Sequence, residues 1–194
     1  MNFDDKTVSE IEEILTYGHC YPAALAMSEV LGWPIGGLIV IARRTNWTPH
    51  LVHAYLVAPD GRAFDANGFR NLDKVYEDFL GNRTEREFRN AEFVTYETSE
   101  EFRHVLRCLY DQCEVPTGMR TEYDDFLDEH LPGIKEAVTQ RLDVVSRARD
   151  AFPELDDADW TETDEEWKAR LRKDVEERFG PTPTDLVPAG AAGW

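Results

Sequence analysis

The chain has 194 residues, of which 42% are hydrophobic, and its formal net charge at pH 7 is -18. This length and apolar content suffice for one domain with a buried core and an extension. The negative charge argues against binding nucleic acid or an anionic membrane surface through a general basic field.

The sequence carries no recognisable targeting or membrane segment. No basic N-terminal stretch precedes an apolar run, and no run approaches the roughly 18 to 20 apolar residues of a membrane span. The three cysteines, Cys20, Cys108 and Cys113, are an odd set without framework spacing, which favours reduced thiols. We therefore expect a cytoplasmic protein that does not associate with membranes.

Hydrophobic spacing predicts two helices at the start of the chain. Val8 to Leu15 carries apolar residues at helical intervals. Cys20 to Leu31 is almost wholly apolar, tolerates Pro22 in its first turn and is followed by Gly32. This pattern predicts a buried helix with Cys20 at its N-terminus.

The next part of the chain alternates short apolar runs with turn signals, as in an antiparallel sheet. The predicted strands are 38–42, 50–58, 62–66 and 92–96, and the predicted helices are 72–80 and 99–112. Helices combined with such a sheet indicate an α+β fold.

A break at 116–118 separates this core from a more charged C-terminal part. Helical periodicity continues at 123–131 and 134–152, 154–178 is strongly charged, and 180–194 is rich in Pro, Gly and Ala. We divide the chain into a core at 1–115, an acidic helical extension at 116–179 and a flexible tail at 180–194.

The segment Pro59-Asp60-Gly61 suits a three-residue hairpin loop in which Gly61 takes the left-handed position. In the resulting register His53, Asp65 and Asn67 project from one face, with Asn67 directly opposite His53 and Asp65 diagonal to it. Either Asp65 or Asn67 can accept the Nδ1 proton of the imidazole. The other face is apolar, so we expect the polar set to lie on the open side.

Cys20 gains reactivity from its place at a helix N-terminus. Free N–H groups and the positive end of the helix dipole favour the thiolate and lower the pKa of the thiol. The same N–H groups can stabilise an oxyanion, although no Gln or Asn precedes Cys20 closely enough to be an evident second donor. Cys20, His53 and Asp65 are therefore candidates for nucleophile, base and orienting carboxylate.

A metal site is the competing interpretation of the same residues. His19, Cys20, His50 and His53 are of the types that bind zinc. However, residues 50 and 53 fall on opposite faces of a predicted strand, and no tight Cys pair is present. We expect neither a metal nor another cofactor.

The order Cys20, His53, Asp65 resembles the papain-like cysteine peptidase superfamily. Gly18-x-Cys20, His53-Ala54 and Phe64-Asp65-x-Asn67-x-Phe69 look like the YopT/AvrPphB type of bacterial effector peptidase. This resemblance implies a papain-like fold with Cys20 as nucleophile, His53 as base and Asp65 as orienter. The same order also resembles transglutaminases and arylamine N-acetyltransferases, so what it implies is acyl transfer through a thioester.

The sequence thus predicts a papain-like α+β core whose Cys20 helix packs on a small antiparallel sheet. The expected function is thiol-dependent acyl chemistry on a protein or peptide amide: proteolysis, deamidation or transfer. The alternative is a non-catalytic papain-like binding module whose acidic extension sequesters a basic protein. The effector resemblance leaves open delivery out of the cell that makes the protein.

Overall fold

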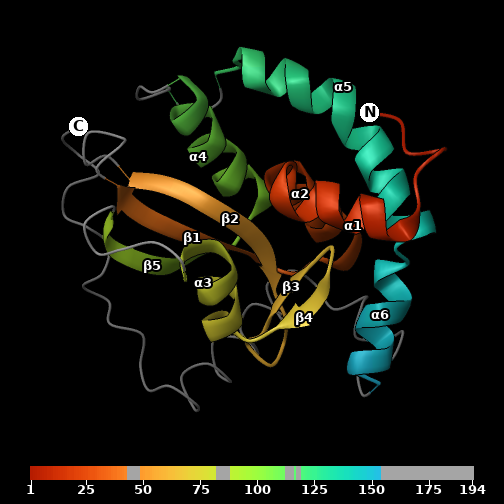
Figure 1. The fold of residues 1–194 in the computed structure, drawn as a ribbon. Coiled ribbons are helices and arrows are strands. Elements are labelled where there is room, and N and C mark those ends of the chain that lie inside the picture. Colours follow the sequence, from red (N-terminus) through yellow and green to blue (C-terminus); the bar gives the residue numbers. More distant parts are fainter. Residues whose placement is uncertain (43–48, 82–87, 112–115, 117–118, 154–194) are drawn as a thin grey trace. The chain divides into compact units, whose positions relative to one another are not determined.

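The computed structural model describes residues 1–42, 49–81, 88–111, 116 and 119–153. The helical elements are α1 (Val8–Tyr17), α2 (Cys20–Leu31), α3 (Leu72–Leu80), α4 (Ser99–Asp111), α5 (Glu122–Glu136), η2 (Ala137–Arg141) and α6 (Val144–Ala151). The strands are β1 (Ile35–Ala42), β2 (Pro49–Val57), β3 (Ala63–Asp65), β4 (Gly68–Arg70) and β5 (Phe88–Tyr96) (Figure 1). This confirms the α+β class.

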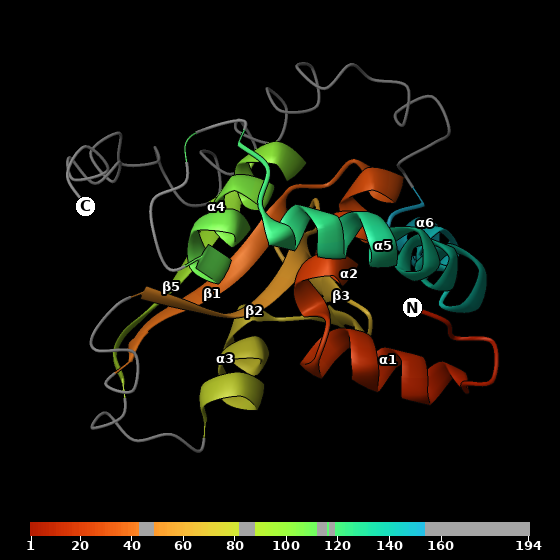
Figure 2. The same ribbon diagram turned by 90° about the horizontal axis from the view of Figure 1, so that it is seen from above.

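The strands form one antiparallel sheet in the order β4-β3-β2-β1-β5. Helix α3 lies on one face of this sheet, and α4 and α5 lie on the other (Figure 2). Both faces are therefore covered. Within the described residues no helix is long and apolar enough to cross a membrane.

Capping residues in the sequence set the start of α1 and the end of α2. A reciprocal capping box starts α1, because the Thr7 side chain accepts from the N–H of Glu10 while the Glu10 carboxylate accepts from the N–H of Thr7. Helix α2 ends at Gly32, whose φ of 70° is left-handed. Because α2 is apolar on nearly all sides, it is buried between the sheet and the later helices.

The face of the sheet under α3 has its own core. Its buried members are Leu38, Val40, Tyr55, Ala63, Val75 and Leu80. Gly36 is required below Tyr55, since a Cβ there would lie 2.2 Å from the tyrosine ring. This close packing holds β2 and β1 in register beneath α3.

Residues 1–153 form one compact unit that includes α5, η2 and α6. Leu127, Leu131 and Ile134 of α5 are buried, and the helix packs on α2. The boundary expected at 115/116 therefore differs from the one in the structure, because the helices assigned to the extension supply the cover that α2 needs. The expectations for 154–179 and for the tail at 180–194 lie outside the described residues.

The helix expected at 134–152 is interrupted. A π-helical turn at Ala137–Arg141 is followed by Asp143 in the left-handed region, with a φ of 47°. The Asp143 side chain accepts from the N–H of Ser146 and so caps α6. The interruption redirects the chain after α5.

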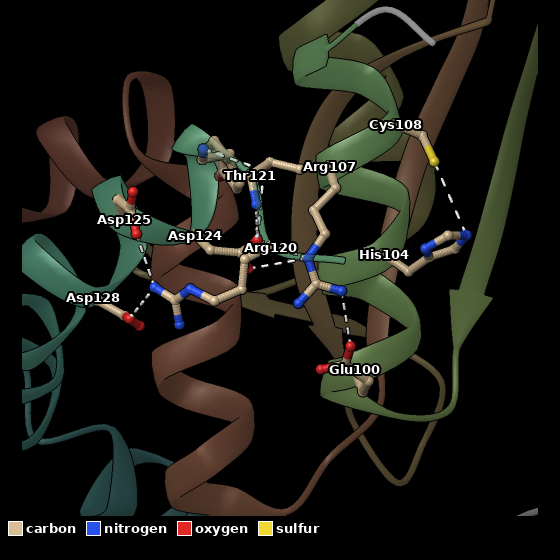
Figure 3. A network of polar contacts seen from close by, with 10 residues as sticks. Glu100, His104, Arg107, Cys108, Arg120, Thr121, Asp124, Asp125 and Asp128 are labelled. Atoms are coloured by element: carbon tan, nitrogen blue, oxygen red, sulfur yellow. Dashed lines mark hydrogen bonds and ion pairs between the residues drawn. The ribbon is translucent and has the colours of Figure 1, made fainter. Parts of the chain in front are cut away.

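A buried ion pair joins α4 to the start of α5 (Figure 3). Nε of Arg107 lies 3.0 and 2.9 Å from the two carboxylate oxygens of Asp124, and Nη1 lies 2.8 Å from Glu100. Arg107 and Asp124 are 7% and 4% exposed. Asp124 also accepts the N–H of Thr121, so one carboxylate caps α5 and pairs with α4.

Asp124→Ala should destabilise the protein, because it removes the buried partner of Arg107 and one half of the capping box of α5. We expect the free energy of unfolding to fall by about 3 kcal/mol. The matched control is Arg120→Ala, since Arg120 pairs with Asp125 and Asp128 at exposed positions. Its urea midpoint should stay close to that of the wild type. Equal midpoints for the two variants would contradict a core role for the Arg107 pair.

Candidate active site

The hairpin between β2 and β3 brings His53 and Asp65 together. Leu56 pairs with Phe64 and Val57 with Ala63, and Gly61 has a φ of 83°, so the predicted three-residue loop and register are confirmed. Nε2 of His53 lies 2.8 Å from Oδ2 of Asp65. The two residues are 0% and 3% exposed. A histidine and a carboxylate expected on one face thus form a buried hydrogen bond.

Asn67 does not lie opposite His53, so that part of the expected register is wrong. Strand β3 ends at Asp65, which pairs with Gly68 across the next turn. Oδ1 of Asp65 accepts the N–H of Asn67 at 2.9 Å, an Asx turn that ends the strand before it reaches the level of His53. Asn67 is exposed in this turn, and its backbone rather than its side chain supports Asp65.

The imidazole uses a different nitrogen from the one expected. Nε2 rather than Nδ1 meets Asp65, and Nδ1 is buried with no hydrogen-bond partner among the described residues. Because an ionised carboxylate can only accept, Nε2 carries the proton and Nδ1 presents a lone pair. The atom available as a base is therefore Nδ1, and no hydrogen bond joins it to the Cys20 sulfur.

The face that carries His53 is covered, contrary to expectation. The ring of Phe79 from α3 stacks on the imidazole with centroids 4.0 Å apart and an angle of 18° between the planes. Tyr17, at the end of α1, contacts Phe79 with centroids 5.5 Å apart. The polar set is buried because α3 crosses the face that an isolated hairpin would leave open.

Cys20 is the first residue of α2 and lies against β2. The backbone N–H groups of Ala54, Cys20 and Tyr21 act to lower the pKa of the Cys20 thiol. Burial has the larger and opposite effect and raises the pKa of the Cys20 thiol to about 11. The expected lowering of this pKa is therefore wrong, since desolvation outweighs the helix N-terminus.

His53 is shifted in the opposite direction. Burial, followed by the nearby Arg70 guanidinium, lowers the pKa of the imidazole to about 3, while Asp78 acts to raise it. Cys20 and His53 are thus both neutral near pH 7. The N–H that acts on the sulfur from β2 belongs to Ala54, the residue that follows His53 in the chain.

The structure gives no support to a metal centre. No group of three or more His, Cys, Asp or Glu side chains in the described part of the chain is placed to hold an ion. His19 precedes α2, and His50 stands at the exposed start of β2. Cys20 and Cys108 are free thiols, and Cys113 lies outside the described residues.

The sequence pattern does not single out two residues that complete the site. Arg70 contacts Asp65, and Phe79 covers His53. The usable signal for Phe79 was its position on the apolar side of the helix predicted at 72–80, four residues after Val75. Arg70 offered none, since strand β4 was not predicted.

Comparisons with family models, curated proteins and solved structures find no match for this chain. What Cys20, His53 and Asp65 can do follows from their geometry and physical chemistry alone.

The low pKa of His53 should make stability depend on pH. In the unfolded chain this imidazole takes up a proton at about pH 6.5, whereas in the folded protein it does so only at about pH 3. As pH falls through this interval, the free energy of unfolding therefore decreases. His53→Gln should remove that contribution. Its urea midpoint should then change less between about pH 6.5 and about pH 3 than the midpoint of the wild type does. Parallel curves for the two proteins would contradict a buried neutral imidazole.

The raised pKa of Cys20 should make the thiol slow to react. Only the thiolate attacks iodoacetamide, so the alkylation rate at Cys20 should be low at neutral pH and still rise above about pH 9. Peptide mass spectrometry separates this residue from Cys108, which serves as an internal comparison. An apparent pKa below about 8.5 for Cys20 alkylation would contradict the dominance of burial.

Proposed function

We propose that this chain is a thiol-dependent acyl-transfer enzyme acting on a protein or peptide amide. Cys20 is the nucleophile, His53 the base and Asp65 the residue that orients the base. The observation that carries the proposal is the buried hydrogen bond from Nε2 of His53 to Asp65 at 2.8 Å, which leaves Nδ1 as the unpartnered nitrogen. A histidine held in one tautomer by a carboxylate is the arrangement that activates a neighbouring nucleophile.

In the proposed reaction, Nδ1 of His53 takes the proton of the Cys20 thiol and the thiolate attacks the amide carbonyl. The resulting tetrahedral intermediate collapses to a thioester as the imidazolium gives its proton to the departing amine. Water or a second amine then attacks the thioester, His53 removes a proton from it, and the thiol returns. The orienting carboxylate stays ionised throughout.

The first turn of α2 is suited to hold the oxyanion. Helix N-termini leave N–H groups without intrahelical partners, and Cys20 and Tyr21 supply two of them beside the sulfur. Pro22 has no N–H, and the N–H of Ala54 on β2 is a third donor that acts on the sulfur. Ala54 thereby offers a second element for the oxyanion site that the sequence pattern lacked.

The alternative is a papain-like binding module without turnover, whose acidic extension sequesters a basic protein. One observation favours it: Cys20 and His53 are both neutral, and His53 is completely buried. Transfer of the thiol proton to His53 is costly while the pKa of Cys20 is raised and that of His53 is lowered. The two functions differ in whether Cys20 forms a covalent acyl intermediate that depends on His53.

Acyl-enzyme formation tests the proposal directly. With p-nitrophenyl acetate, we expect the wild type to release p-nitrophenol slowly but continuously, because both pKa shifts disfavour the thiolate, and to carry an acetyl group on Cys20 after an acid quench. Cys20→Ala should abolish this reaction. His53→Ala should lower the rate by about 10²- to 10⁴-fold, because the base is lost.

Asp65→Ala should lower the rate by about 10²-fold, since the imidazole loses its fixed tautomer. Asn67→Ala is the matched control, because only its backbone N–H contacts Asp65 and that contact survives the change. Acetylation that is equally fast at Cys20 and Cys108, and independent of His53, would contradict the proposal and favour the binding module.

The reaction class can be read from a mixture of unlabelled peptides incubated with the protein. New termini would identify hydrolysis, conversion of Gln to Glu would identify deamidation, and new amide bonds would identify transfer. We expect one of these products in the wild type and none with Cys20→Ala. Mass spectrometry of the mixture measures all three at once.

A further inference from the structure

Arg70 links the carboxylate of Asp65, which orients His53, to helix α3, which covers His53. Its Nη2 donates to the same Asp65 oxygen, Oδ2, that meets His53, and its Nη1 donates to Oδ2 of Asp78 at 2.9 Å. The first contact ties Arg70 on β4 to the orienting carboxylate, and the second ties it to α3. The Arg70 side chain is 12% exposed. A guanidinium so sheltered interacts more strongly with carboxylates than an exposed one does.

The helix held by this contact carries the cover of the base. Asp78 is followed by Phe79, whose ring stacks on the imidazole of His53. The Arg70 guanidinium itself lies 5.9 Å from the centroid of the Phe79 ring. Arg70 thus contacts the group that orients His53 and the helix that buries it.

We propose that Arg70 is a positioning residue of this site, which clamps Asp65 and, through Asp78, holds α3 closed over His53 until α3 is displaced. The inference rests on the proposed function, since it assigns Arg70 a part in the chemistry of Cys20 and His53. Release of the Arg70–Asp78 contact frees α3 to move Phe79 off the face of the imidazole. The imidazole is then less buried, so desolvation opposes its protonation by the Cys20 thiol less strongly.

The charges around His53 agree with this arrangement. Asp65 from β3 pairs with the imidazole, and Arg70 from β4 and Asp78 from α3 act on its pKa in opposite directions. The Arg70 cation acts to lower the pKa of His53, so the clamp opposes formation of an imidazolium. In the closed arrangement the base is both covered and kept neutral.

Arginine suits this role better than lysine. Its planar fork directs two nitrogens at two carboxylates on different elements, whereas a lysine ammonium is a single point charge. Arg70→Lys therefore keeps the positive charge but cannot span Asp65 and Asp78 equally well. Arg70→Met removes the charge as well as both contacts.

The test compares these two variants in the full chain. We expect Arg70→Met to speed iodoacetamide alkylation of Cys20 at neutral pH by about tenfold or more, and to raise the pKa of His53 by about one unit. Arg70→Lys should also speed alkylation but raise the pKa of His53 less than Arg70→Met does, since the charge remains while the cover is loosened. Heteronuclear NMR of the imidazole measures that pKa.

Lys74→Met is the matched control. Lys74 pairs with Asp78 at 2.8 Å but is exposed, and it does not contact Asp65. Its removal deletes one cation from the same carboxylate and leaves the clamp in place. We expect wild-type alkylation at Cys20. Equal rates in Arg70→Met, Lys74→Met and the wild type would overturn the proposal.

Asp78→Asn separates the clamp from the charge and does not depend on the folding of the Arg70 variants. Asp78 acts to raise the pKa of His53, so its loss through charge alone would lower that pKa further and would not activate the thiol. Release of α3 would instead speed Cys20 alkylation by about tenfold. An unchanged or slower rate in Asp78→Asn would overturn the clamp.

These readouts need no substrate and no turnover. Faster alkylation in the Arg70 and Asp78 variants without any acetyl-enzyme would leave the clamp standing and remove the proposed function. An acetyl-enzyme in the wild type together with unchanged alkylation in these variants would leave the proposed function standing and remove the clamp.

Discussion

The buried carboxylate of Asp65 is the group on which the arrangement of the site depends. At 3% exposure it must be satisfied by donors within the protein, and it receives three: Nε2 of His53, Nη2 of Arg70 and the backbone N–H of Asn67. The first sets the tautomer of the imidazole, the second draws β4 and α3 toward β3, and the third ends β3. The same carboxylate therefore sets the tautomer of His53 and the arrangement of β3, β4 and α3 around it.

Closure of the site and suppression of its reactivity have the same physical origin. Desolvation disfavours the charged forms of both Cys20 and His53, so it raises the pKa of one and lowers the pKa of the other. An ionised pair then becomes accessible only when the cover over the imidazole changes. Phe79 is that cover, and it belongs to α3, whose Asp78 pairs with Arg70 of β4 and with Lys74 of the same helix.

The helices on the opposite face of the sheet hold α2 in place. Helix α2 is apolar on nearly all sides, so it needs cover beyond the sheet, and α5 provides it. The Arg107–Asp124 pair sets where α5 begins relative to α4. These helices keep Cys20 against Ala54, and so the position of the thiol depends on residues more than a hundred positions away in the chain.

The sequence by itself determined what depends on neighbours along the chain. The Pro59-Asp60-Gly61 loop implied a register that brought His53 and Asp65 to one face, and the apolar run after Cys20 implied its helix. Only the tertiary structure decided how deeply these residues are buried, because Phe79 and Arg70 come from separate elements. Hydrogen bonding within a hairpin is a local property of turn and strand residues, whereas desolvation depends on every element packed against a group, and no spacing in the sequence encodes it.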